Sequence, residues 1–67
     1  MRAEDIVWVR NNMLLLTTSR RYAVGELERI FDIYNNITGE KKKTTSCGRC
    51  IETVKNRIKK EYDKKRT

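Results

Sequence analysis

Two cysteines stand three positions apart, at Cys47 and Cys50, directly after a run of hydroxyl residues. The thiolate form of cysteine is both the nucleophile and the metal ligand, and a helix N-terminus stabilises it through free amides and the helix dipole. The spacing therefore admits a redox-active pair, half of a zinc site, or two small side chains packed in a core. A redox enzyme of the thioredoxin type also needs a βαβ setting, which nothing in this chain predicts.

A structural zinc ion needs four ligands, and the chain contains two cysteines and no histidine. A zinc site at Cys47 and Cys50 is therefore expected only if another chain completes it. The two cysteines continue the apolar stripe of Val54 and Ile58 at spacings of three and four, and free cysteine is often a small buried side chain. The pattern favours core packing over zinc shared between chains and predicts no cofactor held by one chain alone.

The segment 40–46 joins three consecutive lysines to three hydroxyl residues ahead of a predicted helix. Ammonium groups, hydroxyl donors and unpaired amides are the groups that contact phosphate oxygens. The glycine pattern of a P-loop is missing, so a nucleotide is not indicated, and a solvated polar loop is the alternative. The predicted anion or nucleic-acid contacts are Lys41, Lys42, Lys43, Ser46, Arg49, Lys55, Arg57, Lys59, Arg20 and Arg21.

Sixteen Lys and Arg residues against nine Asp and Glu residues give a formal net charge of +7. Such a chain favours polyanions, whether nucleic acid, an acidic protein face or an anionic membrane surface. Acids interrupt the basic C-terminal run, and Arg57 is expected to pair with Glu61. Arg20 and Arg21 would extend the Lys41–Lys43 cluster into one positive face if the fold brings the two clusters together.

The composition argues against catalysis, because histidine, the commonest general base, is absent and the carboxylates are scattered over predicted helical faces. The longest apolar run, Met13–Leu16, falls far short of the about 18 residues of a membrane span. The first residues lack the basic and apolar regions of a signal peptide. We expect a non-enzymatic protein that is made in the cytoplasm and has no membrane or small-molecule partner.

Hydrophobic spacing predicts three segments. Residues 3–17 carry a helical stripe, although the strand-favouring residues 7–9 and the Asn11-Asn12 pair leave a β-hairpin as the alternative. A second helix is predicted over residues 22–37, ending near Asn35-Asn36, with Gly39 able to take the left-handed conformation that closes a helix end. Gly25 weakens its first turn and can place the start a few residues later. A third helix of about 19 residues is predicted from Ser46 onward, with Thr45 or Ser46 as its N-cap.

Together these segments predict a single basic helical domain over residues 1–67, all-α, built as a small three-helix bundle. Phe31 and Tyr34 fall on the core stripe of the second segment. Trp8 lies off the stripe of the first segment, so it is either an exposed interface anchor or a wrapped edge of the core.

The run from Glu26 to Gly39, the lysine-rich stretch after it and the segment Thr45–Cys50 resemble short Cys-x-x-Cys proteins of tailed bacteriophages, including crAss-like phages of Bacteroidales hosts. The resemblance covers the last two thirds of the chain. Its most specific part is a Tyr-Asn-x-x-Thr-Gly helix end that leads to a Cys-x-x-Cys helix start. The resemblance implies a phage setting and carries over no functional residues.

These observations predict a non-catalytic virion structural or accessory component that docks on an acidic protein face or on packaged DNA. Its expected partners are other protein subunits and double-stranded DNA, and its expected locations are the host cytoplasm during synthesis and the virion. The alternative is a DNA-binding regulator that places the third helix and the Lys41–Lys43 loop on phosphates.

Overall fold

A computed structural model of the chain describes residues 1–18, 21–23 and 25–66. Over these residues the chain forms four helices and no strand: α1 (Ala3–Asn11), α2 (Met13–Thr18), α3 (Glu26–Thr38) and α4 (Gly48–Arg66). The prediction of an all-α fold is confirmed, and the β-hairpin alternative for residues 3–17 is wrong. The first predicted helix is divided into two, so the bundle contains one helix more than expected.

Asn12 causes this division. Its side-chain amide donates to the Trp8 carbonyl at 2.8 Å, and its backbone N–H also points to the last turn of α1. The Asn12 carbonyl accepts from the Leu16 amide at 3.1 Å, which starts α2. Asparagine side chains compete with the helical backbone for hydrogen bonds, and here that competition changes the direction of the chain.

Glycines bound α3 at both ends. Gly25 precedes the helix with φ 92°, and Gly39 follows it with φ 78° and donates to the Asn35 carbonyl at 2.8 Å. Both angles lie in the left-handed region, which glycine enters without a Cβ penalty. The left-handed conformation predicted for Gly39 is confirmed. The helix ends at Thr38, later than the predicted Asn35-Asn36, and it starts at Glu26, a few residues after Tyr22, as Gly25 indicated.

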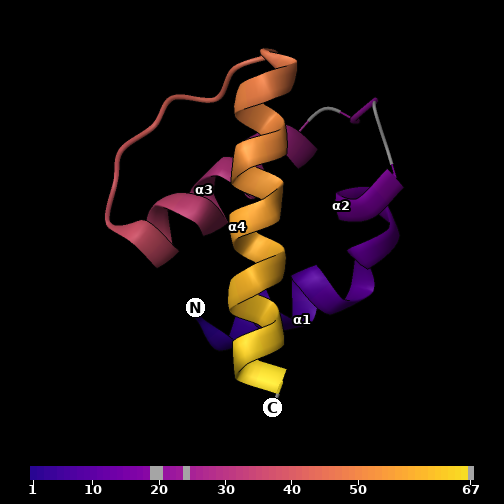
Figure 1. The fold of residues 1–67 in the computed structure, drawn as a ribbon, viewed down its shortest axis with the longest axis vertical. Helices are drawn as coiled ribbons and strands as arrows, with labels where there is room; N and C mark the ends of the chain where they lie inside the picture. Colours follow the sequence, from indigo (N-terminus) through magenta and orange to yellow (C-terminus); the bar gives the residue numbers. More distant parts are fainter. Residues whose placement is uncertain (19–20, 24, 67) are drawn as a thin grey trace.

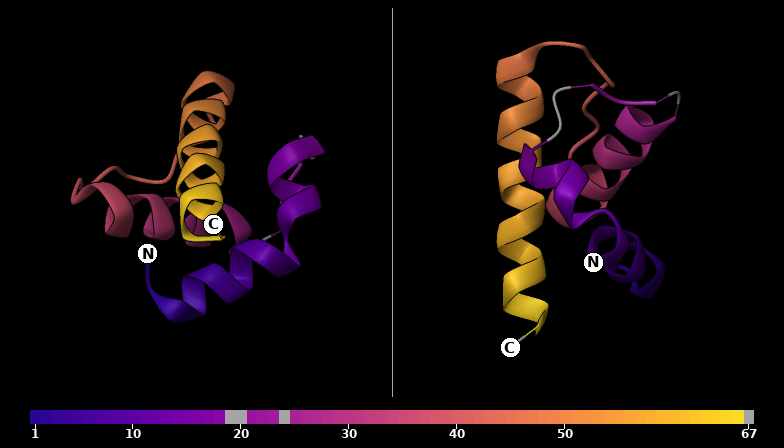
Figure 2. Two further views of the ribbon diagram at one scale, coloured as in Figure 1. Left: turned by 60° about the horizontal axis from the view of Figure 1, so that its bottom comes forward. Right: turned by 90° about the vertical axis from the view of Figure 1, so that its right-hand side faces the viewer.

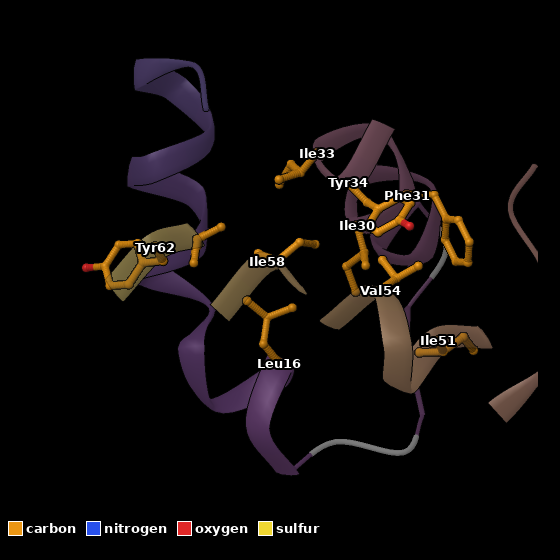
Figure 3. Close-up of a cluster of buried hydrophobic side chains, with 10 residues drawn as sticks. Leu16, Ile30, Phe31, Ile33, Tyr34, Ile51, Val54, Ile58 and Tyr62 are labelled. Carbon is orange, nitrogen blue, oxygen red and sulfur yellow. The ribbon is translucent and has the colours of Figure 1, made fainter. Parts of the chain in front are cut away.

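α4 forms one side of the molecule, and α1, α2 and α3 lie on its other side (Figures 1 and 2). Its apolar stripe meets side chains of α2 and α3 in the core (Figure 3). Phe31 and Tyr34 lie in the core as predicted, as do Val54 and Ile58 of the α4 stripe. The buried apolar side chains are Val9, Leu16, Ile30, Phe31, Ile33, Tyr34, Ile51, Val54, Ile58 and Tyr62.

A charged group joins α1 to α3. Asp5 is 0% exposed, and its carboxylate lies 2.7 Å from Arg2 Nε and 2.9 Å from Arg29 Nη2. Arg2 also contacts Asp32 on α3 at 2.6 Å. A buried carboxylate without a cation is strongly unfavourable, so Asp5 requires Arg29 beside it. The sequence pattern gives no sign of this contact between residues far apart in the chain.

Replacing Ile58 tests the role of the α4 stripe. We expect Ile58→Ala to lower the free energy of unfolding by about 2–5 kcal/mol, because the buried side chain leaves a cavity between α4 and its neighbours. Leu14→Ala serves as the control, since Leu14 is 75% exposed. Urea denaturation followed by circular dichroism measures both. Equal effects of the two substitutions would contradict the packing described.

Replacing Asp5 tests the ion pairs between α1 and α3. We expect Asp5→Asn to cost about 2–3 kcal/mol, because it leaves the half-buried Arg29 without its anion. Asp32→Asn removes a contact of Arg2 at a side chain that is 56% exposed, and should cost less than about 1 kcal/mol. The same denaturation measurement compares them, and a larger effect at Asp32 would refute the assignment.

Candidate functional site

The Lys41–Lys43 loop follows the C-terminal end of α3 and is held against that helix. The Asn35 side chain accepts from the Lys42 amide at 3.1 Å and donates to the Lys42 carbonyl at 3.0 Å. The Lys42 ammonium lies 5.4 Å from the centre of the Tyr34 ring. All three lysines are exposed, as expected of an anion-binding loop, but the charge of Lys42 is directed at the protein's own ring.

Glu40 also contributes to the order of this loop. A hydrogen bond between the Tyr34 hydroxyl and the Glu40 carboxylate lowers the pKa of Glu40 and raises the pKa of Tyr34. The Glu40 amide donates to Thr38 Oγ1 at 3.2 Å. An ionised carboxylate therefore stands next to the lysines and offsets part of their charge.

The two basic clusters do not form one face. Arg21 lies before the N-terminal end of α3 and the Lys41–Lys43 loop lies after its C-terminal end, so the 13-residue helix, about 20 Å long, stands between them. Figure 1 shows the two connecting segments at different ends of α3. Arg20 lies outside the described residues. The prediction of a continuous positive face is therefore wrong for Arg21.

Lys55 is not a surface contact, which corrects the prediction for this residue. Its exposure is 5%, its ammonium donates to the Tyr22 hydroxyl at 2.9 Å, and Glu52 lies 3.9 Å away. Lys55 follows Ile51 by four positions and precedes Ile58 by three, so it shares the buried side of α4. The helical spacing indicates that Lys55 is buried, but a lysine is normally expected at the surface.

The outer side of α4, opposite its apolar stripe, carries a row of exposed basic residues. Arg49 and Arg57 were predicted contacts and are exposed, whereas Lys59 is half-buried. Lys60 and Lys64 were not among the predicted contacts. Both are exposed, and they lie on the outer side because they follow Arg57 at spacings of three and four. We call the set of Arg49, Arg57, Lys60 and Lys64 the outer basic row.

Glu61 flanks this row. Its carboxylate lies 3.5 Å from Arg57 and 3.8 Å from Lys64. The predicted pairing of Arg57 with Glu61 is confirmed. Surface pairs of this kind are weak, so a stronger polyanion can replace Glu61 as the partner of both cations.

The start of α4 differs from the prediction. The helix begins at Gly48, so Cys47 occupies the N-cap position instead of Thr45 or Ser46. The Cys47 amide donates to Thr45 Oγ1 at 3.2 Å, which fixes the turn into the helix. Ser46 is exposed beside this turn. The Thr45 hydroxyl therefore fixes the backbone turn before α4, although Thr45 is not the N-cap residue.

Cys47 is exposed and Cys50 is half-buried, so the prediction that both pack in the core is wrong for Cys47. Hydrogen bonds from the Cys50 thiol and from the Cys50 and Arg49 amides lower the pKa of Cys47. The bond to Cys47 raises the pKa of Cys50. The amides that were expected at a phosphate are thus directed at the Cys47 sulfur.

Trp8 is half-buried and packs against the core, which confirms the edge-of-core interpretation over the exposed anchor. Among the residues that the structure describes, the exposed large apolar side chains are instead Val7 and Leu14. Single exposed apolar residues are ordinary on protein surfaces, so these two define no binding patch.

The described part of the chain has neither a cluster of metal-binding side chains nor a membrane-spanning helix. There, no three His, Cys, Asp or Glu side chains cluster closely enough to hold a metal ion. Over the same residues, none of the helices has the length and apolar character needed to cross a bilayer.

No family model, no curated protein and no solved structure matches this chain. Its function is therefore inferred from its own residues and their arrangement.

Alkylation tests the difference between the two cysteines. In the reduced, metal-free protein we expect iodoacetamide to modify Cys47 faster than Cys50 at neutral pH, because Cys47 is exposed and its thiolate accepts two backbone amides. Peptide mass spectrometry over time measures the two rates, and the separate variants Cys47→Ser and Cys50→Ser assign them. Faster modification of Cys50 would contradict the geometry.

Proposed function

We propose that the protein is a non-catalytic binding module of a tailed bacteriophage, an accessory component of the virion that contacts packaged double-stranded DNA through the outer basic row of α4. The observation that carries the proposal is the placement of α4. α1, α2 and α3 lie on one side of it, so no helix of the described residues covers its outer side (Figure 2).

The dimensions of the row suit a DNA backbone. Arg49 and Lys64 are fifteen positions apart, which is about 22 Å along the helix axis. Successive phosphates of one DNA strand are separated by about 3.4 Å along the duplex, so the row spans about six of them. Four cations over this length can contact phosphates without reading bases, as packing against DNA of any sequence requires.

The side chains support a binding role without catalysis. The chain contains no histidine to activate a nucleophile. The hydroxyls of Thr17, Thr18, Thr38 and Thr53 each donate to the carbonyl four residues earlier in their own helix. The phage setting rests on the resemblance of the chain from Glu26 on, and the net charge of +7 suits a polyanionic partner.

Charge reversal within the row tests the DNA contact. We expect binding to random-sequence duplex DNA at about 50 mM salt that weakens steeply toward about 200 mM. Lys60→Glu should reduce the magnitude of the slope of log affinity against log salt by about 1, because it removes one phosphate contact. Arg10→Glu is the matched control: it changes net charge equally but lies on α1, where Arg10 is exposed.

Absence of DNA binding at the lower salt would overturn the proposal, as would equal slopes for the Lys60 and Arg10 variants. Salt-sensitive binding to an acidic polypeptide but not to DNA would identify an acidic protein face as the partner instead. Mass spectrometry of purified virions tests the location, and a virion without the chain would exclude an accessory component.

A sequence-specific regulator is the second candidate, because Asn56 stands beside Arg49 and Arg57 on the exposed outer side of α4. Asparagine and arginine are the side chains that most often read adenine and guanine edges. Competition between one selected duplex and random DNA separates the two functions. A strong preference that Asn56→Ala abolishes would support the regulator.

A further inference from the structure

The cysteine pair lies at one extremity of the molecule. The N-terminal end of α4 is at the top of Figure 1, where the longest axis is vertical, and the longest extent of the fold is 31 Å. α1 lies toward the opposite end of α4. A second molecule can therefore approach Cys47 and Cys50 without meeting the core helices.

The two sulfurs are arranged as a chelating pair. Cys47 directly precedes α4 and Cys50 lies in its first turn, so both sulfurs belong to the same helix end. The Ile51 amide donates to the Cys47 carbonyl at 3.0 Å, which holds the two residues within one helical turn. A C-x-x-C pair is a ligand spacing of structural zinc sites, in which both sulfurs bind one ion.

The residues around the pair suit an anionic site. Cys47 is exposed and Cys50 is half-buried, and Arg49, an exposed cation, stands between them in the chain. Four thiolates around one zinc ion carry a net charge of about −2, which an arginine from each copy offsets. The Thr45 bond to the Cys47 amide holds the turn in place.

One copy supplies two ligands, since the chain has two cysteines and no histidine. We propose that Cys47 and Cys50 of two copies of the chain bind one zinc ion, which joins two molecules at the N-termini of their α4 helices. A two-fold axis through the ion brings two identical pairs together and closes the tetrahedron. A chain of 67 residues has a thin core, and a shared metal is one way in which such chains gain stability.

The binding step is a ligand exchange without electron transfer. Each of the four thiols loses its proton to the buffer as its sulfur forms a bond to zinc, and the water molecules bound to zinc leave. This inference does not depend on the DNA contact, because the ligands are at the end of α4 and the outer basic row extends along its length.

Native mass spectrometry tests the site directly. We titrate the reduced, metal-free chain with zinc sulfate and expect a dimer with one zinc ion, which returns to monomer on addition of a chelator. The double variant Cys47→Ser, Cys50→Ser should remain a monomer at every zinc concentration. Thr44→Ala, an exposed residue of the same loop, is the control and should dimerise like the parent.

Cobalt(II) gives a second measurement that needs no variant. Titration of the unmodified chain should produce the intense visible bands of tetrahedral cobalt thiolate and saturate at one cobalt per two chains. A monomer that binds no zinc would overturn the proposal, as would a zinc dimer that persists in the folded double variant.

Discussion

Burial of the apolar stripe of α4 is the constraint on which the other elements depend. The stripe extends from Ile51 to Tyr62, longer than the six residues of α2 can cover. Several shorter helices therefore share the task, and Asn12 changes the chain direction so that α1 and α2 can both reach α4. Removal of this apolar area from water is the main favourable contribution to folding a chain of this size.

The burial of this stripe also determines which basic residues of α4 are exposed. Because α4 is covered along one side, its cations divide into Lys55, which is buried against Tyr22, and the outer basic row, which is open to a partner. The lysine loop is held by Asn35 and Tyr34, so its position is set by α3. Basic residues adjacent in sequence thus have different surroundings and different possible roles.

Asp5 and the cysteine pair are two polar groups outside the apolar core with distinct physical consequences. Asp5 is buried and ion-paired with Arg2 and Arg29, so it links α1 to α3 and stabilises one arrangement of these helices. Cys47 is exposed at a helix end, where amides stabilise its thiolate. The first group is internally paired, whereas the second leaves sulfur available to an external ligand.

The sequence by itself determined the helical class, the apolar stripe of α4, the helix end at Gly39 and the absence of histidine chemistry, because spacing and residue type act locally. Only the tertiary structure decided that Lys55 is buried, that Asp5 meets Arg29, that Arg21 is separated from the lysine loop and that Cys47 is exposed. Helical periodicity defines which residues share a face. It does not define where a helix begins or which segment packs on that face, and these depend on contacts between residues far apart in the chain.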